Sequence, residues 1–160
     1  MSRFDEGMKL LEEKFGNYKD SILALATIAL EPSASGKPRP VVRDLDVYYE
    51  DGIFYAVTWG LSNKMQEIAQ NNEVGFSLNM EWFNGSATAK NLGHALKPEN
   101  AELRTKLRKC FEVWYDKANN ENSEHCVYLA IELTKGVINI NHFEKLYLMD
   151  FVNKTAQVRE

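Results

Sequence analysis

The sequence predicts a mostly β protein with flanking helices. Residues 41–49 and 74–80 alternate between apolar and polar side chains, the period-2 pattern of strands with one face in a core. Asp51-Gly52 and Asn84-Gly85 follow such runs and are typical of tight hairpin turns. Two other stretches carry apolar residues at helical spacing. A chain of 160 residues is long enough to bury a substantial core, and we expect one domain over residues 1–160.

Composition and charge are those of a soluble globular protein. The chain is 44% hydrophobic and 26% charged, and its net charge of −4 disfavours nonspecific binding to nucleic acid or to anionic membranes. No apolar run approaches the ~20 residues of a membrane span, and the first residues lack the hydrophobic region of a signal peptide. We therefore expect a cytoplasmic protein. Cys110 and Cys126 are too few for a disulfide framework, and we expect both to be reduced and buried.

The N-terminal stretch predicts an amphipathic helix over residues 4–15, ended by Gly16 and packed against the β-structure. Its apolar face consists of Phe4, Met8, Leu11 and Phe15. Residues 21–30 are apolar on both faces, so periodicity alone leaves open whether they form a buried strand or a helical segment. Residues 31–37, with their proline, glycine and serines, predict a loop.

Arg43 interrupts the apolar face of the strand predicted over residues 41–49. A guanidinium on that face needs an anionic or carbonyl partner. The partner could be a carboxylate of the protein, or a phosphate or carbonyl group of a ligand. The Asp51-Gly52 turn places the next strand, residues 53–58, beside the first, so Arg43 and residues 58–64 are expected at the same end of the hairpin.

A short helix is predicted just after this hairpin. Helical spacing begins at Met65 and recurs at Ile68 and Ala69. Ser62 stands before the helix, where its hydroxyl can accept a bond from a first-turn N–H group. Lys64 then lies at the positive end of the helix dipole, an unfavourable position that costs about 0.3–1 kcal/mol. An anion bound there would make the electrostatic energy of the site favourable. The alternative is a capped helix with a solvated lysine.

The second half of the chain adds strands and one long helix. Residues 86–96 predict a strand with small residues on one side, and helical spacing then predicts a helix over about residues 98–119. Residues 126–133, 136–140 and 146–151 predict further short strands, and the polar tail beyond residue 152 is expected to fray. The three histidines have no metal-ligand spacing, so no metal site is expected.

Several motifs, in this order and spacing, resemble the pyridoxamine 5′-phosphate oxidase-like family of FMN-binding split β-barrels. They are Gly36-Lys37-Pro38-Arg39, Arg43, Tyr48-Tyr49-Glu50-Asp51-Gly52, Phe54-Tyr55-Ala56-Val57-Thr58 and Ser62-Asn63-Lys64. The resemblance implies a six-stranded antiparallel split β-barrel with flanking helices, built from about residues 21–96 and 125–151, in which residues 21–30 are a buried strand. It also implies an FMN cofactor bound between the subunits of a homodimer.

The resemblance assigns roles to individual residues. Lys64 resembles the lysine that binds the FMN phosphate, and Ser62 lies in the same loop. Arg43 resembles the arginine on the strand that passes the isoalloxazine ring. Val57 and Thr58 match a pair whose backbone and hydroxyl contact the flavin.

Two further positions, Thr88 and Trp82, resemble residues near the cofactor, and Trp82 would contribute from the partner chain. Asn63 stands where many members have an arginine, which removes one bidentate phosphate donor. Residues 151–160 lack the Trp- and Arg/His-bearing segment that true pyridoxamine phosphate oxidases use on substrate, so a vitamin B6 oxidase is not predicted.

The leading functional hypothesis is an FMN-binding protein, with oxidoreductase chemistry on an unidentified small molecule supplied by the flavin rather than by a catalytic side chain. A non-catalytic dimeric stress-response or cofactor-binding module is the alternative, holding FMN loosely, haem, a deazaflavin or no cofactor. A third hypothesis is a structural dimer in which Arg43 and Lys64 pair with carboxylates such as Asp44 or Asp46 of neighbouring chains.

Overall fold

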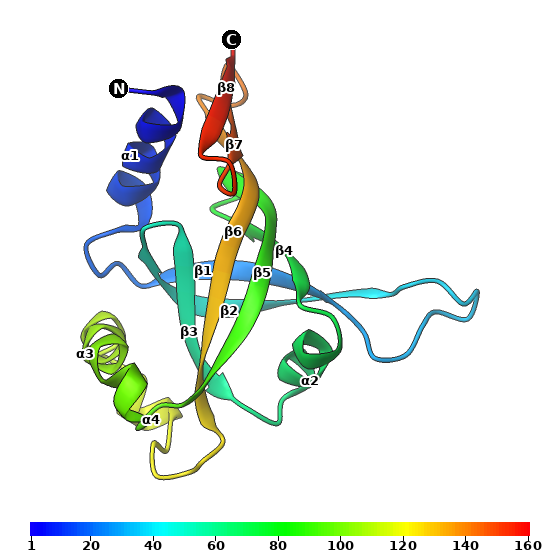
Figure 1. Ribbon diagram of the computed structural model, residues 1–160, viewed down its shortest axis with the longest axis vertical. Helices are drawn as coiled ribbons and strands as arrows, with labels where there is room; N and C mark the ends of the chain where they lie inside the picture. Colours follow the sequence, from blue (N-terminus) through cyan, green and yellow to red (C-terminus); the bar gives the residue numbers. More distant parts are fainter.

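The computed structural model describes all 160 residues. Eight strands form one antiparallel sheet in the order β3-β2-β1-β4-β5-β6-β7-β8, and β3 also pairs with β6. This last pairing closes six strands into a barrel, while β7 and β8 extend the sheet beyond it (Figure 1). The predicted six-stranded antiparallel split barrel is confirmed. The strands are β1 (Ser21–Ile28), β2 (Pro40–Glu50), β3 (Ile53–Trp59), β4 (Glu73–Leu78), β5 (Phe83–His94), β6 (Cys126–Ile140), β7 (Lys145–Asp150) and β8 (Thr155–Arg159).

The barrel is split where β2 and β3 diverge. Their pairing is confined to the residues next to the Asp51-Gly52 turn, whereas the rest of β2 pairs with β1 and the whole of β3 pairs with β6. Gly52 has φ +83°, a value that favours glycine in such a turn. Helix α2 (Asn63–Gln70) follows β3 and packs against β1 and β5. It therefore lies where the first part of β2 and the end of β3 have separated.

The N-terminal helix α1 (Arg3–Phe15) starts at a capping box between Ser2 and Asp5, which satisfies orphan backbone donors. It buries Leu11 and Phe15 in the main core and packs against β2, β7 and β8. Figure 1 shows α1 beside the β7–β8 extension and α3 and α4 at the other end of the barrel.

The prediction of a single helix over residues 98–119 is wrong. The chain forms a 3-10 turn η1 (Pro98–Asn100), α3 (Ala101–Cys110) and, after a turn, a short α4 (Tyr115–Ala118). At the break Phe111 stacks on Trp114, with ring centroids 4.7 Å apart. Both Phe111 and Tyr115 are buried, and the Tyr115 hydroxyl lies 2.6 Å from that of Tyr128 on β6. Burial of these rings against the barrel outweighs the helical continuity that the spacing favours.

The C-terminal tail is also ordered rather than frayed. β8 pairs with β7 from Thr155 to Arg159, and its alternate residues Ala156 and Val158 pack against the main core beside α1. The segments predicted as separate strands over residues 126–133 and 136–140 form one strand, β6, which runs through Gly136. The order of β8 and the continuity of β6 depend on pairing with neighbouring strands, which a local sequence pattern does not reveal.

Two clusters of buried side chains hold the fold together. The main cluster fills the barrel and includes Leu25, Phe54, Phe76 and Phe83. The second lies between the outer face of the barrel and helices α3 and α4. Both cysteines are free and buried, as expected. No helix of the structure is long and apolar enough to cross a membrane.

Candidate cofactor site at the start of helix α2

Helix α2 begins at Asn63, with Ser62 in the N-cap position and in an extended conformation. The Ser62 hydroxyl accepts no cap bond, contrary to the prediction. It accepts instead from the Lys64 ammonium, at 3.4 Å. The first N–H groups of a helix have no intrahelical acceptor. The start of α2 therefore combines a hydroxyl not engaged in capping, backbone donors and a cation, all of which favour an anion.

Lys64 is a half-buried cation without an acidic partner. No carboxylate forms an ion pair with its ammonium group. Its pKa is lowered, first by burial and then by the positive charge of Arg43. Arg43 bonds to Glu67 of α2, the helix that also carries Lys64, so the two predicted cations lie at the same end of the barrel.

Arg43, by contrast, has an acidic partner within its own chain. Its Nη2 donates to Glu67 Oε1 at 2.7 Å, and its Nη1 donates to the hydroxyl of Thr27. The same hydroxyl donates to Glu67 Oε1 at 2.8 Å. The Glu67 side chain is only 8% exposed and that of Arg43 is 23% exposed. The partner that Arg43 needs is thus present within its own chain, as the Glu67 carboxylate of α2.

The charges at this end of the barrel do not cancel. Arg43 and Lys64 contribute two positive charges, and Glu67 contributes one negative charge, which is paired with Arg43 alone. The excess cation is Lys64, which lies partly out of water, where a lone charge is costly. The arrangement can therefore bind an anion and gain energy from it.

Val57 and Thr58 lie near the end of β3, the strand that precedes α2, and their side chains point to opposite faces of the sheet. Thr58 is 8% exposed and shares the inner face of β3 with the barrel core, whereas Val57 packs against the cluster of α3 and α4. If both residues contact one ligand on the inner face, Thr58 can therefore use its hydroxyl, whereas Val57 can use only its backbone. Thr88 pairs with Glu73, which closely follows α2.

Trp82 lies away from the other candidate residues within one subunit. It follows the far end of β4, whose six residues span about 20 Å at roughly 3.3 Å per residue. Its ring packs on Phe15 of α1, with centroids 5.6 Å apart, and the Lys14 ammonium lies 4.8 Å from the ring centroid. A role of Trp82 at the α2 site therefore requires a second subunit.

Glu67 and Thr27 are residues of the candidate site that the sequence analysis did not identify. Helical spacing places Met65 and Ile68 on the buried face, as found, but the third apolar residue of that pattern, Ala69, is exposed and Glu67 is buried instead. The available signal was indirect. Arg43 on an apolar face needs an anionic or carbonyl partner, and Glu67 is the only acidic residue of α2.

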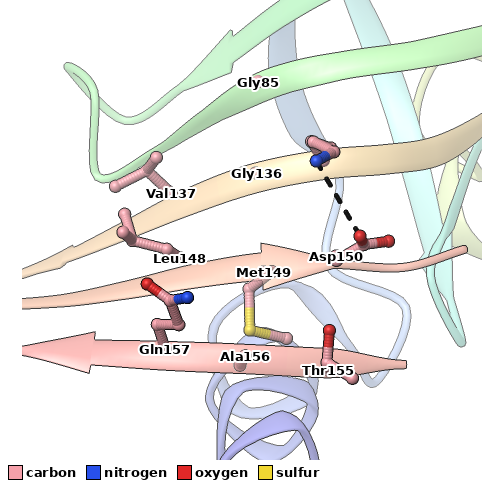
Figure 2. Close-up of a pocket in the computed structure, with 10 residues that line it drawn as sticks. Gly85, Gly136, Val137, Leu148, Met149, Asp150, Thr155, Ala156 and Gln157 are labelled. Atoms are coloured by element: carbon pink, nitrogen blue, oxygen red, sulfur yellow. Dashed lines mark ion pairs between the residues drawn. The ribbon is translucent and has the colours of Figure 1, made fainter. Parts of the chain in front are cut away.

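The pocket in Figure 2 is separate from this site. It has a volume of about 460 Å³ and lies on the sheet extension, between residues of β5, β6, β7 and β8, with Lys135 Nζ 3.8 Å from an Asp150 oxygen at its edge. None of its lining residues belongs to α2, β2 or β3. It therefore has no part in the arrangement around Lys64.

Comparison with known proteins identifies the fold. No protein-family model matches the chain, and no curated protein sequence matches it. Solved structures do match. One is a Clostridium acetobutylicum protein related to general stress protein 26 and described as of the pyridoxinephosphate oxidase family. It is 13% identical, with a TM-score of 0.61 over 96% of this chain and 99% of that chain.

Two other solved structures bear on the cofactor. A pyridoxamine 5′-phosphate oxidase-related, FMN-binding protein of Nostoc punctiforme is 12% identical, with a TM-score of 0.59 over 97% of this chain and 93% of that one. A haem-binding protein of Mycobacterium smegmatis is 9% identical, with a TM-score of 0.63 over 94% of this chain and 58% of that one. The chain thus has the split-barrel fold of the pyridoxamine 5′-phosphate oxidase-related proteins.

Proposed function

We propose that the protein binds FMN with the phosphate at the start of helix α2. The observation that carries this proposal is Lys64, a half-buried cation with a lowered pKa and no acidic partner. A phosphate monoester carries up to two negative charges and would relieve the repulsion between Lys64 and Arg43. The FMN-binding protein of Nostoc punctiforme with the same fold supports the choice of this particular phosphate compound.

The residues at the start of α2 fit a phosphate group. The Ser62 hydroxyl is not used as a cap, and Lys64 and the first backbone N–H groups complete a set of donors. Asn63 is exposed at the first helical position and adds a neutral amide donor. Arg43 acts through Glu67, holding α2 against β1 and β2 so that Lys64 keeps its place.

The flavin ring is proposed to lie along β3, near Thr58 and the backbone of Val57, with Thr88 at its edge. Trp82 would complete the site from a second subunit of a homodimer. Bound FMN would supply hydride or single-electron transfer, which makes an oxidoreductase acting on a small molecule the proposed activity. The protein's own part is to bind the phosphate, orient the ring and exclude water from it.

The test is a titration with FMN and with riboflavin, followed by absorbance and fluorescence. Riboflavin carries the same ring without the phosphate, so it separates phosphate recognition from ring stacking. Saturable FMN binding that is at least about ten-fold tighter than riboflavin binding would support the phosphate role of Lys64, given about 1.5–3 kcal/mol for a hydrogen bond to a charged group. Equal affinities for the two flavins would refute that role.

Haem is the second candidate cofactor. The observation in its favour is the fold shared with the haem-binding protein of Mycobacterium smegmatis. The same protein sample can be titrated with haemin. A saturable Soret band together with indifference to FMN would favour haem over the flavin.

A further inference from the structure

A pocket lies on the outer side of the barrel, between strand β5 and the start of helix α3. Its volume is about 520 Å³, within the roughly 300–1,000 Å³ of small-molecule sites. Its apolar surface comes from Tyr55 of β3, Leu92 of β5 and Leu103 of α3, which rest on the second cluster of buried side chains. The pocket shares no residue with the α2 site, so binding in it is independent of the proposed FMN function.

Asn100 brings an unpartnered acceptor to this pocket. Its side-chain NH₂ donates to the Leu92 carbonyl at 3.1 Å and to the His94 carbonyl at 2.9 Å. These two bonds set the orientation of the amide, because a flipped amide would place its oxygen against two carbonyl oxygens. Asn100 stands in the N-cap position of α3, yet its side chain makes no cap bond, and its Oδ1 accepts no hydrogen bond.

The Asn100 oxygen is within reach of a ligand. The residue as a whole is only 5% exposed, but its Oδ1 retains accessible surface, unlike the unpaired side-chain oxygens of Tyr49 and Asn139, which are enclosed. Asn100 also lines the pocket. An amide oxygen accepts from an N–H or O–H donor. The pocket therefore favours a ligand that carries such a donor.

Lys97 places a cation next to this acceptor. Its side chain occupies the space beside Gly93, where φ is +81° and a Cβ would stand 3.0 Å from Lys97 Cδ and 3.2 Å from Nζ. Gly93 lies between the two residues whose carbonyls hold the Asn100 amide, so the ammonium and the amide are anchored on the same three residues of β5. No carboxylate forms an ion pair with Lys97.

The charges that line the pocket balance, with three lysines and three glutamates. Lys106 donates to both carboxylate oxygens of Glu50, at 2.7 and 3.0 Å, and is thereby neutralised. Lys90 is a second cation without an ion pair, and Glu99 is a carboxylate without one. A ligand that carries both signs of charge therefore finds a partner for each.

We propose that this pocket binds an amino acid with an apolar or aromatic side chain. The carboxylate of the ligand pairs with Lys97, its ammonium donates to Asn100 Oδ1, and its side chain packs on the apolar residues of the pocket. An α-amino acid carries its two charged groups on one carbon, which matches a cation and an acceptor anchored on one short segment. A plain carboxylate leaves the Asn100 oxygen without a donor, and a plain ammonium compound leaves Lys97 without an anion.

The test uses NMR on the full chain labelled with ¹⁵N. The signals to follow are the Asn100 side-chain amide and the Gly93 backbone amide. The probes are L-phenylalanine, 2-phenylethylammonium, which lacks the carboxylate, and 3-phenylpropanoate, which lacks the ammonium. We expect saturable shifts of both signals with L-phenylalanine. Binding should be at least about three-fold weaker without the carboxylate, which pairs with an exposed lysine, and at least about ten-fold weaker without the ammonium, which bonds to a buried oxygen.

A variant of an exposed residue then tests the cation. Lys97→Gln should weaken L-phenylalanine about three-fold and leave 2-phenylethylammonium unchanged, because only the former carries a carboxylate. Lys9→Gln, an exposed lysine on α1, is the matched control and should change neither. The comparison of L-phenylalanine with 3-phenylpropanoate tests the Asn100 oxygen without altering a residue that holds α3 to β5.

Three outcomes would overturn the proposal. Equal affinity for L-phenylalanine and 3-phenylpropanoate would show that the Asn100 oxygen takes no part in binding. Unchanged binding of L-phenylalanine in Lys97→Gln would remove the lysine from the site. The absence of saturable shifts with L-phenylalanine would show that the pocket does not bind an amino acid.

Discussion

Arg43 Nη2 lies 2.7 Å from Glu67 Oε1, and this contact ties strand β2 to helix α2. Thr27 on β1 bonds to both partners, so three elements meet at one buried carboxylate. The pair resolves an alternative that the sequence leaves open, because the arginine on the apolar face of β2 has a partner within the protein. It also leaves Lys64 as the cation without a carboxylate.

The ion pair predicts that Arg43→Leu destabilises the free protein. The change leaves Glu67 buried with only Thr27 to bond it, and breaking such a pair costs about 3 kcal/mol. The double variant Arg43→Leu with Glu67→Leu should have a free energy of unfolding within about 1 kcal/mol of that of the native protein, because no unpaired buried charge remains. Urea unfolding measures both. A single variant as stable as the native protein would show that the pair is not structural.

Lys64→Ala should weaken FMN binding about ten-fold or more while leaving riboflavin binding unchanged, since a charged hydrogen bond is worth about 1.5–3 kcal/mol. The free protein should lose no stability, because the change removes a half-buried charge that Arg43 repels. Fluorescence titration and urea unfolding give the two readouts. Lys9→Ala, an exposed lysine on α1, is the control. Parallel loss of stability and of affinity would point to a purely structural lysine.

Glu67→Gln should act in the opposite direction on ligand binding. Removal of the carboxylate's charge leaves two positive charges near the start of α2 and none to balance them, so a phosphate should bind more tightly. The free protein should be less stable, because Arg43 loses its charged partner. Thermal unfolding with and without FMN tests both parts. The stabilisation by FMN should be larger in the variant than in the native protein, and a smaller stabilisation contradicts the arrangement.

The carboxyl groups of Asp20 and Asp46 predict a pH dependence of stability. The pKa of Asp46 is raised from 3.8 to about 6, first by burial and then by a hydrogen bond and the like charge of Asp20. A raised pKa means that the folded protein binds the proton more tightly than the unfolded chain. Stability should therefore fall as the pH rises from about 4 to about 6.

Asp46→Asn should remove this fall and raise the free energy of unfolding at pH 7 relative to the native protein. Asp46 is exposed, so solvent screening reduces the effect and we predict its direction only. Urea unfolding at pH 4.5 and pH 7 measures it. Asp44→Asn, exposed on the same face of β2, is the control. An unchanged pH profile in Asp46→Asn would contradict the prediction.

Local patterns were enough to identify the first hairpin and the helices α1 and α2. The hairpin predicted at Asn84-Gly85 is wrong, because the turn between β4 and β5 consists of residues 79–82 and both residues pair with β4 inside β5. The Asp51-Gly52 turn, the alternation along β2 and the start of α2 at Asn63 all follow from interactions among residues close in the chain. The resemblance carried by residues 36–64 added the barrel itself, which the β3–β6 pairing then closes.

Only the tertiary structure decided how the candidate residues are partnered. Glu67 is 24 positions from Arg43, and the helical pattern of α2 gave no reason to bury an acid. The tail became a strand because β7 offers a free edge and α1 covers Ala156 and Val158. Trp82 was separated from Lys64 by the length of β4. Each outcome depends on contacts between segments far apart in the sequence, and the energies of such contacts cannot be inferred from residues close together in the chain.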